Sequence, residues 1–120
     1  MREYKFRGFD VVGKKWVYGD LVHNMKVTAT GTAPRVMVGG YEVNPESVGE
    51  RTGIKDKNGV DIYEYDLIKF DCVGLVYVRY DTEHCQFELC HMSGWFADKL
   101  WALNRERYEV VGNMFNTDNV

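Results

Sequence analysis

Hydrophobic and polar residues alternate along several short stretches of the chain, and this period of two is typical of β-strands. The alternating stretches predict strands at residues 4–9, 16–23, 67–70, 75–80, 86–90 and 108–115. Segment 97–104 contains good helix formers in a row, with apolar residues three and four positions apart, and it predicts a helical turn or two. The pattern therefore indicates an all-β fold with one or two short helical turns.

The clearest turn signal lies in the middle of the chain, at Asn58-Gly59. An Asn-Gly pair between β-branched and aromatic residues favours a hairpin, because both residues tolerate the positive φ angles of its turn. We predict a turn from Asp56 to Gly59 and expect the carboxylates of Asp56 and Asp61 to keep the hairpin tip solvated. Asp66, in the bend before the next strand, is expected to accept backbone hydrogen bonds, as Asp commonly does in turns.

Segment 24–40 is rich in small residues, including the run 28–34 and the pair Gly39-Gly40. Because such residues restrict the backbone little and pack poorly, we predict a mobile loop at 24–40, in which 35–38 could form a short strand. After this loop, Asn44 and Pro45 have the character of a helix cap and a first helical residue, which predicts about one helical turn.

Five short strands after residue 67, separated by tight turns, match the plan of a small closed barrel, because closure removes exposed strand edges. The same pattern also allows a β-sandwich. A chain of 120 residues fits one domain, or one domain made of two subdomains.

Composition and charge narrow the class of protein. Hydrophobic residues make up 45% of the chain, which excludes a disordered protein, and the net charge of −3 argues against a protein that coats nucleic acid. There is no 18-residue apolar run and no signal-peptide pattern, so a cytoplasmic protein is expected. Cys72, Cys85 and Cys90 are an odd number of cysteines in a chain well supplied with apolar residues, and we expect free thiols.

His84, Cys85, Cys90 and His91 lie within eight residues and raise the question of a zinc site, because zinc prefers thiolate and imidazole ligands. On a strand, however, Cys85 and His91 share one face about 20 Å apart at roughly 3.3 Å per residue, too far for a common ion. We therefore expect no metal ligand and no cofactor.

The sequence also argues against an enzyme. It contains no nucleophile elbow, phosphate loop or dinucleotide-binding fingerprint. The carboxylates between residues 56 and 71 match no calcium loop, and structural roles explain them more simply than acid–base catalysis. We expect no catalytic residue.

Aromatic and basic residues are the remaining candidates for function. Protein binding or self-association as a homo-oligomer is the favoured hypothesis, with residues 36–38 as a candidate strand edge. Binding of nucleic acid by a small barrel is the alternative, because exposed aromatic side chains beside basic ones can stack on bases. The candidate interaction surface comprises Tyr63, Tyr65, Lys69, Arg79, Trp95, Trp101, Arg105 and Arg107.

The stretch from Val48 to Phe70, VGERTGIKDKNGVDIYEYDLIKF, resembles the signature VGxxTGxKDKNGxxIYEGDIVKF of the YopX family of phage and prophage proteins. The resemblance extends to residues 4–10, 18–21, 41–46 and 108–113, in the expected order. One departure is Tyr65, at a position where the family usually has Gly. A Gly there would allow a tight bend with positive φ.

The resemblance implies a single YopX-like domain over residues 1–120, with an N-terminal β-subdomain at 1–55 and an SH3-like barrel at 56–120. It implies no catalytic role. It also implies that the protein works as an accessory protein in the cytoplasm of a host cell.

Overall fold

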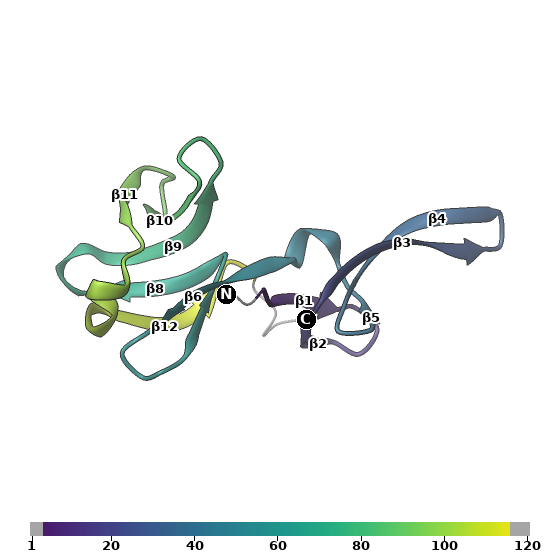
Figure 1. Ribbon diagram of the computed structural model, residues 1–120, viewed down its shortest axis with the longest axis horizontal. Coiled ribbons are helices and arrows are strands. Elements are labelled where there is room, and N and C mark those ends of the chain that lie inside the picture. Colours follow the sequence, from purple (N-terminus) through teal and green to yellow (C-terminus); the bar gives the residue numbers. More distant parts are fainter. Residues whose placement is uncertain (1–3, 116–120) are drawn as a thin grey trace. The chain divides into compact units, whose positions relative to one another are not determined.

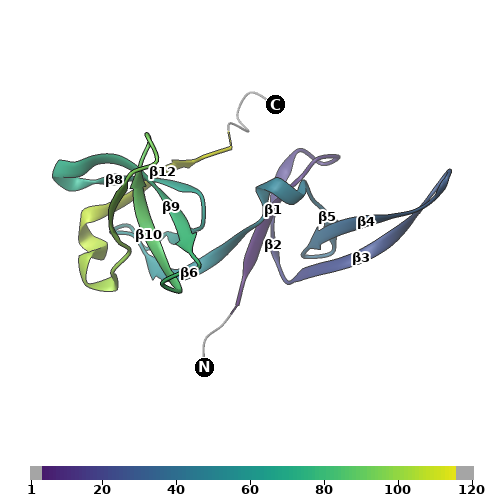
Figure 2. The ribbon, with the colours of Figure 1, turned by 90° about the horizontal axis from the view of Figure 1, so that it is seen from above.

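The computed structural model describes residues 4–115, and Cys72 among them only by its backbone. The chain divides into two compact units, Met1–Glu50 and Arg51–Val120. Strands dominate both units (Figures 1 and 2), which confirms the predicted all-β fold. Within the described residues, the helical segments are short 3-10 turns, and none has the length or apolar character needed to cross a membrane.

The first unit contains β1 (Phe6–Asp10), β2 (Lys15–Gly19), β3 (Leu21–Thr28), β4 (Gly31–Val38), β5 (Tyr41–Glu42) and the 3-10 helix η1 (Pro45–Ser47). Strand β6 (Gly49–Lys55) begins in the first unit and ends in the second. The second unit continues with β7 (Asp61–Tyr63), β8 (Asp66–Phe70), η2 (Asp71–Val73), β9 (Gly74–Asp81), β10 (Gln86–His91), β11 (Phe96–Lys99), η3 (Ala102–Arg107) and β12 (Tyr108–Asn113).

A small core holds the first unit together, formed by Val17, Val38 and Val43. Gly8 lies against this core, and a Cβ atom there would come within 2.8 Å of the Val43 side chain, so β1 needs glycine at this position. The predicted cap before η1 is present, because Asn44 accepts a hydrogen bond from the Glu46 amide through its side chain.

The structure corrects the prediction of a mobile loop at 24–40. Strands β3 and β4 pair along their whole length, from Leu21 opposite Val38 to Thr28 opposite Gly31, and form a long hairpin. Figures 1 and 2 show this hairpin extending well beyond the short strand β5. Small residues misled the prediction because cross-strand hydrogen bonds and side-chain pairs, which single-strand patterns do not reveal, stabilise the hairpin.

The second unit is built on a five-stranded antiparallel sheet in the order β11-β10-β9-β8-β12. One face of this sheet carries the core, formed by Ile62, Ile68, Phe70, Val76, Val78, Leu89 and Tyr108. The two edge strands, β11 and β12, do not pair with each other among the described residues, so the closed SH3-like barrel stays a prediction.

The helical prediction for 97–104 is wrong for its first half. Residues Phe96–Lys99 form β11, which pairs with β10, and the 3-10 helix η3 begins only at Ala102. Pairing with a neighbouring strand outweighs helix propensity, which differs by less than about 1 kcal/mol per residue among ordinary residues.

Asp56 is the second correction, because its carboxylate is buried and only 3% of the residue is exposed. One carboxylate oxygen, Oδ1, accepts hydrogen bonds from the amides of Asn58 and Val60 inside the predicted turn, at 2.8 and 2.9 Å. The other, Oδ2, accepts the amide of Val110 on β12 at 2.9 Å. Asp56 therefore joins the β6–β7 turn to the edge strand of the sheet, and does not solvate the hairpin tip.

Tyr65 forms the bend before β8 with a φ angle of 71°, so the left-handed bend is kept without the glycine. Its amide donates to the Val78 carbonyl at 2.7 Å, and its carbonyl accepts the Met114 amide at 2.8 Å. Its ring packs edge-on against Phe115, with the ring centroids 5.6 Å apart. Backbone hydrogen bonds on both sides hold the residue in a conformation that an L side chain rarely adopts.

Tyr65→Gly should be more stable than Tyr65→Ala by about 1 kcal/mol, because both lose the ring but only glycine relieves the left-handed strain. Urea unfolding of both variants measures this difference. The matched control is Glu64, which has no positive φ, where glycine should be less stable than alanine. The same order at both positions would contradict the interpretation.

Asp56→Asn should lower the free energy of unfolding by about 1–3 kcal/mol near neutral pH, because an amide cannot accept hydrogen bonds at both ends. Burial by itself raises the pKa of Asp56, but the amides of Val110, Val60 and Asn58 outweigh it and hold the pKa below its ordinary value. Stability from this carboxylate is thus present above the ordinary carboxyl pKa and is lost as the pH falls through the folded-state pKa.

Urea unfolding of the wild type and Asp56→Asn, near neutral pH and in acid, checks this expectation. The difference between the two proteins should shrink in acid. Asp61→Asn is the control, because Asp61 makes an ion pair with Lys55 at 3.0 Å near the surface and should cost less than about 1 kcal/mol. A pH-independent difference at Asp56 would contradict the role assigned to its charge.

Candidate functional site

One face of the β3–β4 hairpin carries exposed apolar side chains. Alternation along the strands places the side chains of β3 and β4 on two faces, and we call one of them the hairpin face. Its residues are Leu21, His23, Met25 and Val27 of β3, opposite Val38, Val36, Pro34 and Thr32 of β4.

The hairpin face begins inside the protein and ends in solvent. Leu21, Val36 and Val38 belong to the core of the first unit or pack against it. Further along the hairpin, Met25 is 57% exposed and Val27 is 89% exposed. Together with Pro34 they extend the apolar surface of the core into solvent.

A shallow depression of about 410 Å³ lies on this part of the hairpin. Its lining comprises His23, Asn24, Met25, Pro34, Arg35, Val36 and Pro45. Charged contacts belong to the opposite face, where Arg35 donates to Asn24 at 2.6 Å and Lys26 pairs with Glu42 at 2.8 Å. The charged contacts of the hairpin thus lie on one face, and the hairpin face has no Lys, Arg, Asp or Glu.

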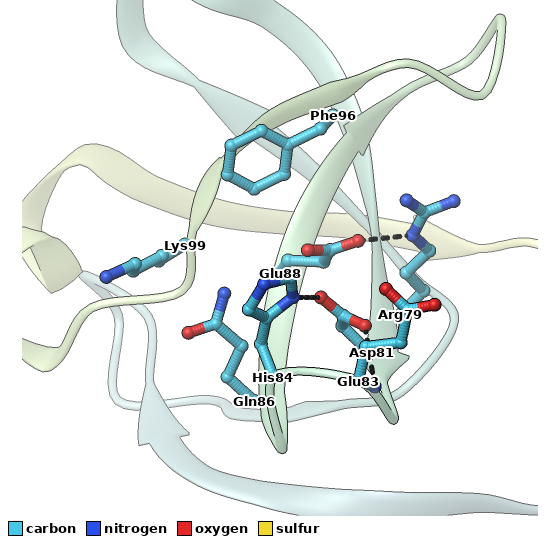
Figure 3. Close-up of a pocket in the computed structure, with 8 residues that line it drawn as sticks. All are labelled: Arg79, Asp81, Glu83, His84, Gln86, Glu88, Phe96 and Lys99. Atoms are coloured by element: carbon cyan, nitrogen blue, oxygen red, sulfur yellow. Dashed lines mark hydrogen bonds and ion pairs between the residues drawn. The ribbon is translucent and has the colours of Figure 1, made fainter.

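The second unit carries a different kind of site, a polar depression of about 440 Å³ over strands β9, β10 and β11 (Figure 3). Eight residues line it: Arg79, Asp81, Glu83, His84, Gln86, Glu88, Phe96 and Lys99. The lining contains three carboxylates, two permanently charged cations and one histidine, so both signs of charge are present.

An ion pair forms the floor of the polar depression. Glu88 is only 4% exposed and lies directly opposite Arg79 in the β9–β10 pairing, with Arg79 Nε 2.6 Å from its carboxylate. This hydrogen bond raises the pKa of Arg79 above its ordinary value. A buried carboxylate needs a partner of opposite charge, so we infer that this ion pair serves to stabilise the sheet.

The rim of the depression is the turn between β9 and β10. The imidazole Nδ1 of His84 lies 2.5 Å from Asp81, and Figure 3 shows the two side chains facing each other. Their hydrogen bond lowers the pKa of Asp81 and raises the pKa of His84. Asp81 also accepts the amide of Glu83, so hydrogen bonds of the turn itself explain the cluster.

Among the residues that the structure describes, Asp81, Glu83 and His84 are the only group of three potential metal ligands whose atoms converge. The group contains no thiol. Cys85 lies in the exposed turn and Cys90 is buried within β10, so the cysteines and histidines of segment 84–91 do not assemble.

The candidate interaction surface predicted from the sequence is spread over separate places. Tyr63 is buried, which corrects its assignment to a surface. Lys69 lies opposite Leu75, and Arg79 lies four residues further along β9, about 13 Å away at roughly 3.3 Å per residue. Tyr65 forms the bend before β8, whereas Trp95 and Trp101 are exposed beyond β10.

The three arginines of that set have acidic partners, and the partner of Arg79 is Glu88. Arg107 lies 2.8 Å from Asp71, and Arg105 lies 3.4 Å from Glu106. A small depression is lined by three basic and three acidic residues: Lys57, Lys69, Arg107, Asp71, Glu106 and Glu109. The described residues therefore give no concentrated positive surface around an exposed aromatic side chain.

Sequence reasoning missed the hairpin face. The signal was present, because Leu21, His23, Met25 and Val27 alternate with more polar residues, and Val36 and Val38 continue the pattern on the other strand. Small residues at the hairpin tip and a proline inside β4 concealed it, since both usually indicate loops.

The thiols of Cys85 and Cys90 should differ strongly in reactivity. Burial raises the pKa of Cys90 and shields its sulfur, whereas Cys85 is exposed. With a water-soluble alkylating reagent, peptide mass spectrometry should show fast modification of Cys85 and slow modification of Cys90. Both should react alike in denaturant, and equal rates in the native protein would contradict the assigned burial. The side chain of Cys72 lies outside the described residues.

Two comparisons bear on identity. A search of curated proteins finds no significant match to this chain. The model of the family described as YopX protein matches residues 5–119, nearly the whole chain. This match covers both units and includes the hairpin face as well as the β6–β7 turn. The chain therefore belongs to the YopX family.

Proposed function

We propose that this chain is a non-enzymatic binding module, an accessory protein of a phage or prophage that acts in the host cytoplasm by binding protein through its hairpin face. One observation carries the proposal: the apolar surface of the first core continues onto the exposed side chains of Met25 and Val27. Exposed apolar surface of this kind is typical of sites where another protein packs.

The chemistry of the surface supports a protein partner over nucleic acid. Met25, Val27 and Pro34 offer no charge that could neutralise phosphate, and the hairpin face has no arginine or lysine. In the second unit, the arginines predicted to bind nucleic acid have carboxylate partners at 2.6 to 3.4 Å. Nucleic-acid binding is therefore the second hypothesis.

The carboxylates support the non-enzymatic part of the proposal. Asp56 accepts three backbone amides, Asp66 accepts the amide of Tyr63 at 2.8 Å, and Glu88 is paired with Arg79. Each of these buried carboxylates accepts hydrogen bonds from the fold itself, and that structural role accounts for its burial without a catalytic one.

Site-specific photo-crosslinking in bacterial cells tests the proposal. With p-benzoylphenylalanine in place of Val27, irradiation should give protein adducts several-fold above those obtained with the same probe at Val12. Val12 is a matched control because it is 94% exposed and lies in the same unit, outside the hairpin. The adducts at Val27 should disappear when Met25→Asp adds a charge to the hairpin face.

Equal labelling at the two positions, or no adduct at either, would overturn the proposal. Adducts that are removed by nuclease but resist protease would reverse the ranking in favour of nucleic acid. An adduct between two copies of the chain and an adduct with a different protein would both support binding through the hairpin face.

A further inference from the structure

Strand β3 is an edge strand with an open row of backbone groups. The sheet order is β3-β4-β5, so among the described residues β3 pairs on one side only. The amide of Val43 donates to the carbonyl of Val36 at 3.0 Å, which shows that the backbone of Val36 points toward β5 and away from β3. Its partner across the hairpin, His23, therefore directs its own N–H and C=O away from β4.

The period of two extends this orientation along β3. Leu21, His23, Met25 and Val27 all direct their backbone groups to the open edge, and these are the same residues whose side chains form the hairpin face. A strand added at this edge would thus gain hydrogen bonds and apolar contacts from one set of residues.

The other edge of the hairpin is closed. Strand β5 pairs with β4 at Met37 and Val38, and the amide of Val43 extends this cover to Val36. Beyond them, at a position whose backbone also points outward, β4 has Pro34, which has no N–H to donate. Proline is a common means of preventing strand addition at an exposed edge. The hairpin is protected on the β4 side and open on the β3 side.

The side chains of β3 fit a second copy of the same strand. In an antiparallel pair with its two-fold axis at Asn24, Leu21 faces the partner's Val27 and His23 faces the partner's Met25. Lys26, the only Lys, Arg, Asp or Glu residue of β3, faces the partner's Val22. No like charges meet, and all four outward-directed residues take part, whereas a register shifted by two residues uses only three.

We propose that the hairpin face binds a second copy of this chain, and that the two copies join antiparallel through strand β3 near Asn24. This inference rests on the proposed function and specifies its partner. The dimer is closed by its two-fold axis and extends each hairpin sheet across both copies, with Met25 and Val27 of each copy covered.

Light scattering of the purified full chain over a range of concentrations tests the inference. The wild type should reach the mass of a dimer, and Met25→Pro should weaken dimerisation about tenfold or more, because it removes an outward N–H from each copy. Met25→Ala is the control that keeps this N–H. The β3–β4 hydrogen bonds avoid position 25, so circular dichroism of Met25→Pro should match the wild type.

A disulfide test remains informative if Met25→Pro does not fold. In a background with Cys72→Ser and Cys85→Ser, Asn24→Cys places two thiols opposite each other at the two-fold axis, in a close pair with Cα atoms about 4.5 Å apart. Mild oxidation should link two copies of Asn24→Cys. Lys26→Cys should give no such link, because Lys26 faces the partner's Val22 in this register.

Three results would overturn the inference: a monomer at all concentrations, a dimer that Met25→Pro leaves unchanged, or equal disulfide formation by Asn24→Cys and Lys26→Cys. If photo-crosslinking at Val27 meanwhile captures another protein specifically, the proposed function stands and only the second copy is excluded. If neither crosslinks nor a dimer is found, both fail.

Discussion

Every β-strand has backbone N–H and C=O groups on two sides, and the need to satisfy them governs this structure. An all-β chain of 120 residues has many such edges and few helices to cover them. In the second unit, neighbouring strands satisfy most of these groups within one antiparallel sheet. In the first unit, a long hairpin leaves one edge of β3 without a neighbouring strand among residues 4–115.

Buried carboxylates complete the hydrogen bonding where strands end. Asp56 accepts amides from its own turn and from β12, and thus takes the place of a strand partner at the edge of the sheet. Asp66 does the same for the amide of Tyr63 in the bend before β8. In the same bend, Tyr65 tolerates a left-handed conformation because hydrogen bonds to Val78 and Met114 hold its backbone. Both aspartates stabilise the fold by accepting hydrogen bonds, and for Asp56, whose pKa is lowered by these amides, the contribution is lost in acid.

The same constraint connects the fold to the proposed function. A protein that closes the β4 edge with Pro34 and leaves β3 open has an asymmetric hairpin, with one side available for a further strand. The exposed apolar side chains of that strand lie on the hairpin face. The match to the YopX family gives the family of the chain and no binding or catalytic residues. The proposed binding therefore rests on the exposed apolar residues of β3.

Much of the fold could be predicted from the sequence by itself. Alternation and the Asn58-Gly59 pair located strands and the central turn, Asn44 and Pro45 located the 3-10 helix η1, and the stretch 48–70 pointed to the family. These features depend on residues close together in the chain, where local geometry and turn preferences act directly.

The tertiary structure decided the features that depend on distant residues. Asp56 lies in a segment whose composition is typical of a solvated turn. In the folded chain its carboxylate is buried and accepts a hydrogen bond from the amide of Val110, 54 positions away. Residues 24–40 have the composition of a loop, and only the pairing of β3 with β4 makes them a hairpin with an apolar face. Sequence patterns record the preferences of each segment, whereas burial and pairing are set by whichever segments meet in the folded chain, because a hydrogen bond or a packed side chain needs both of its partners.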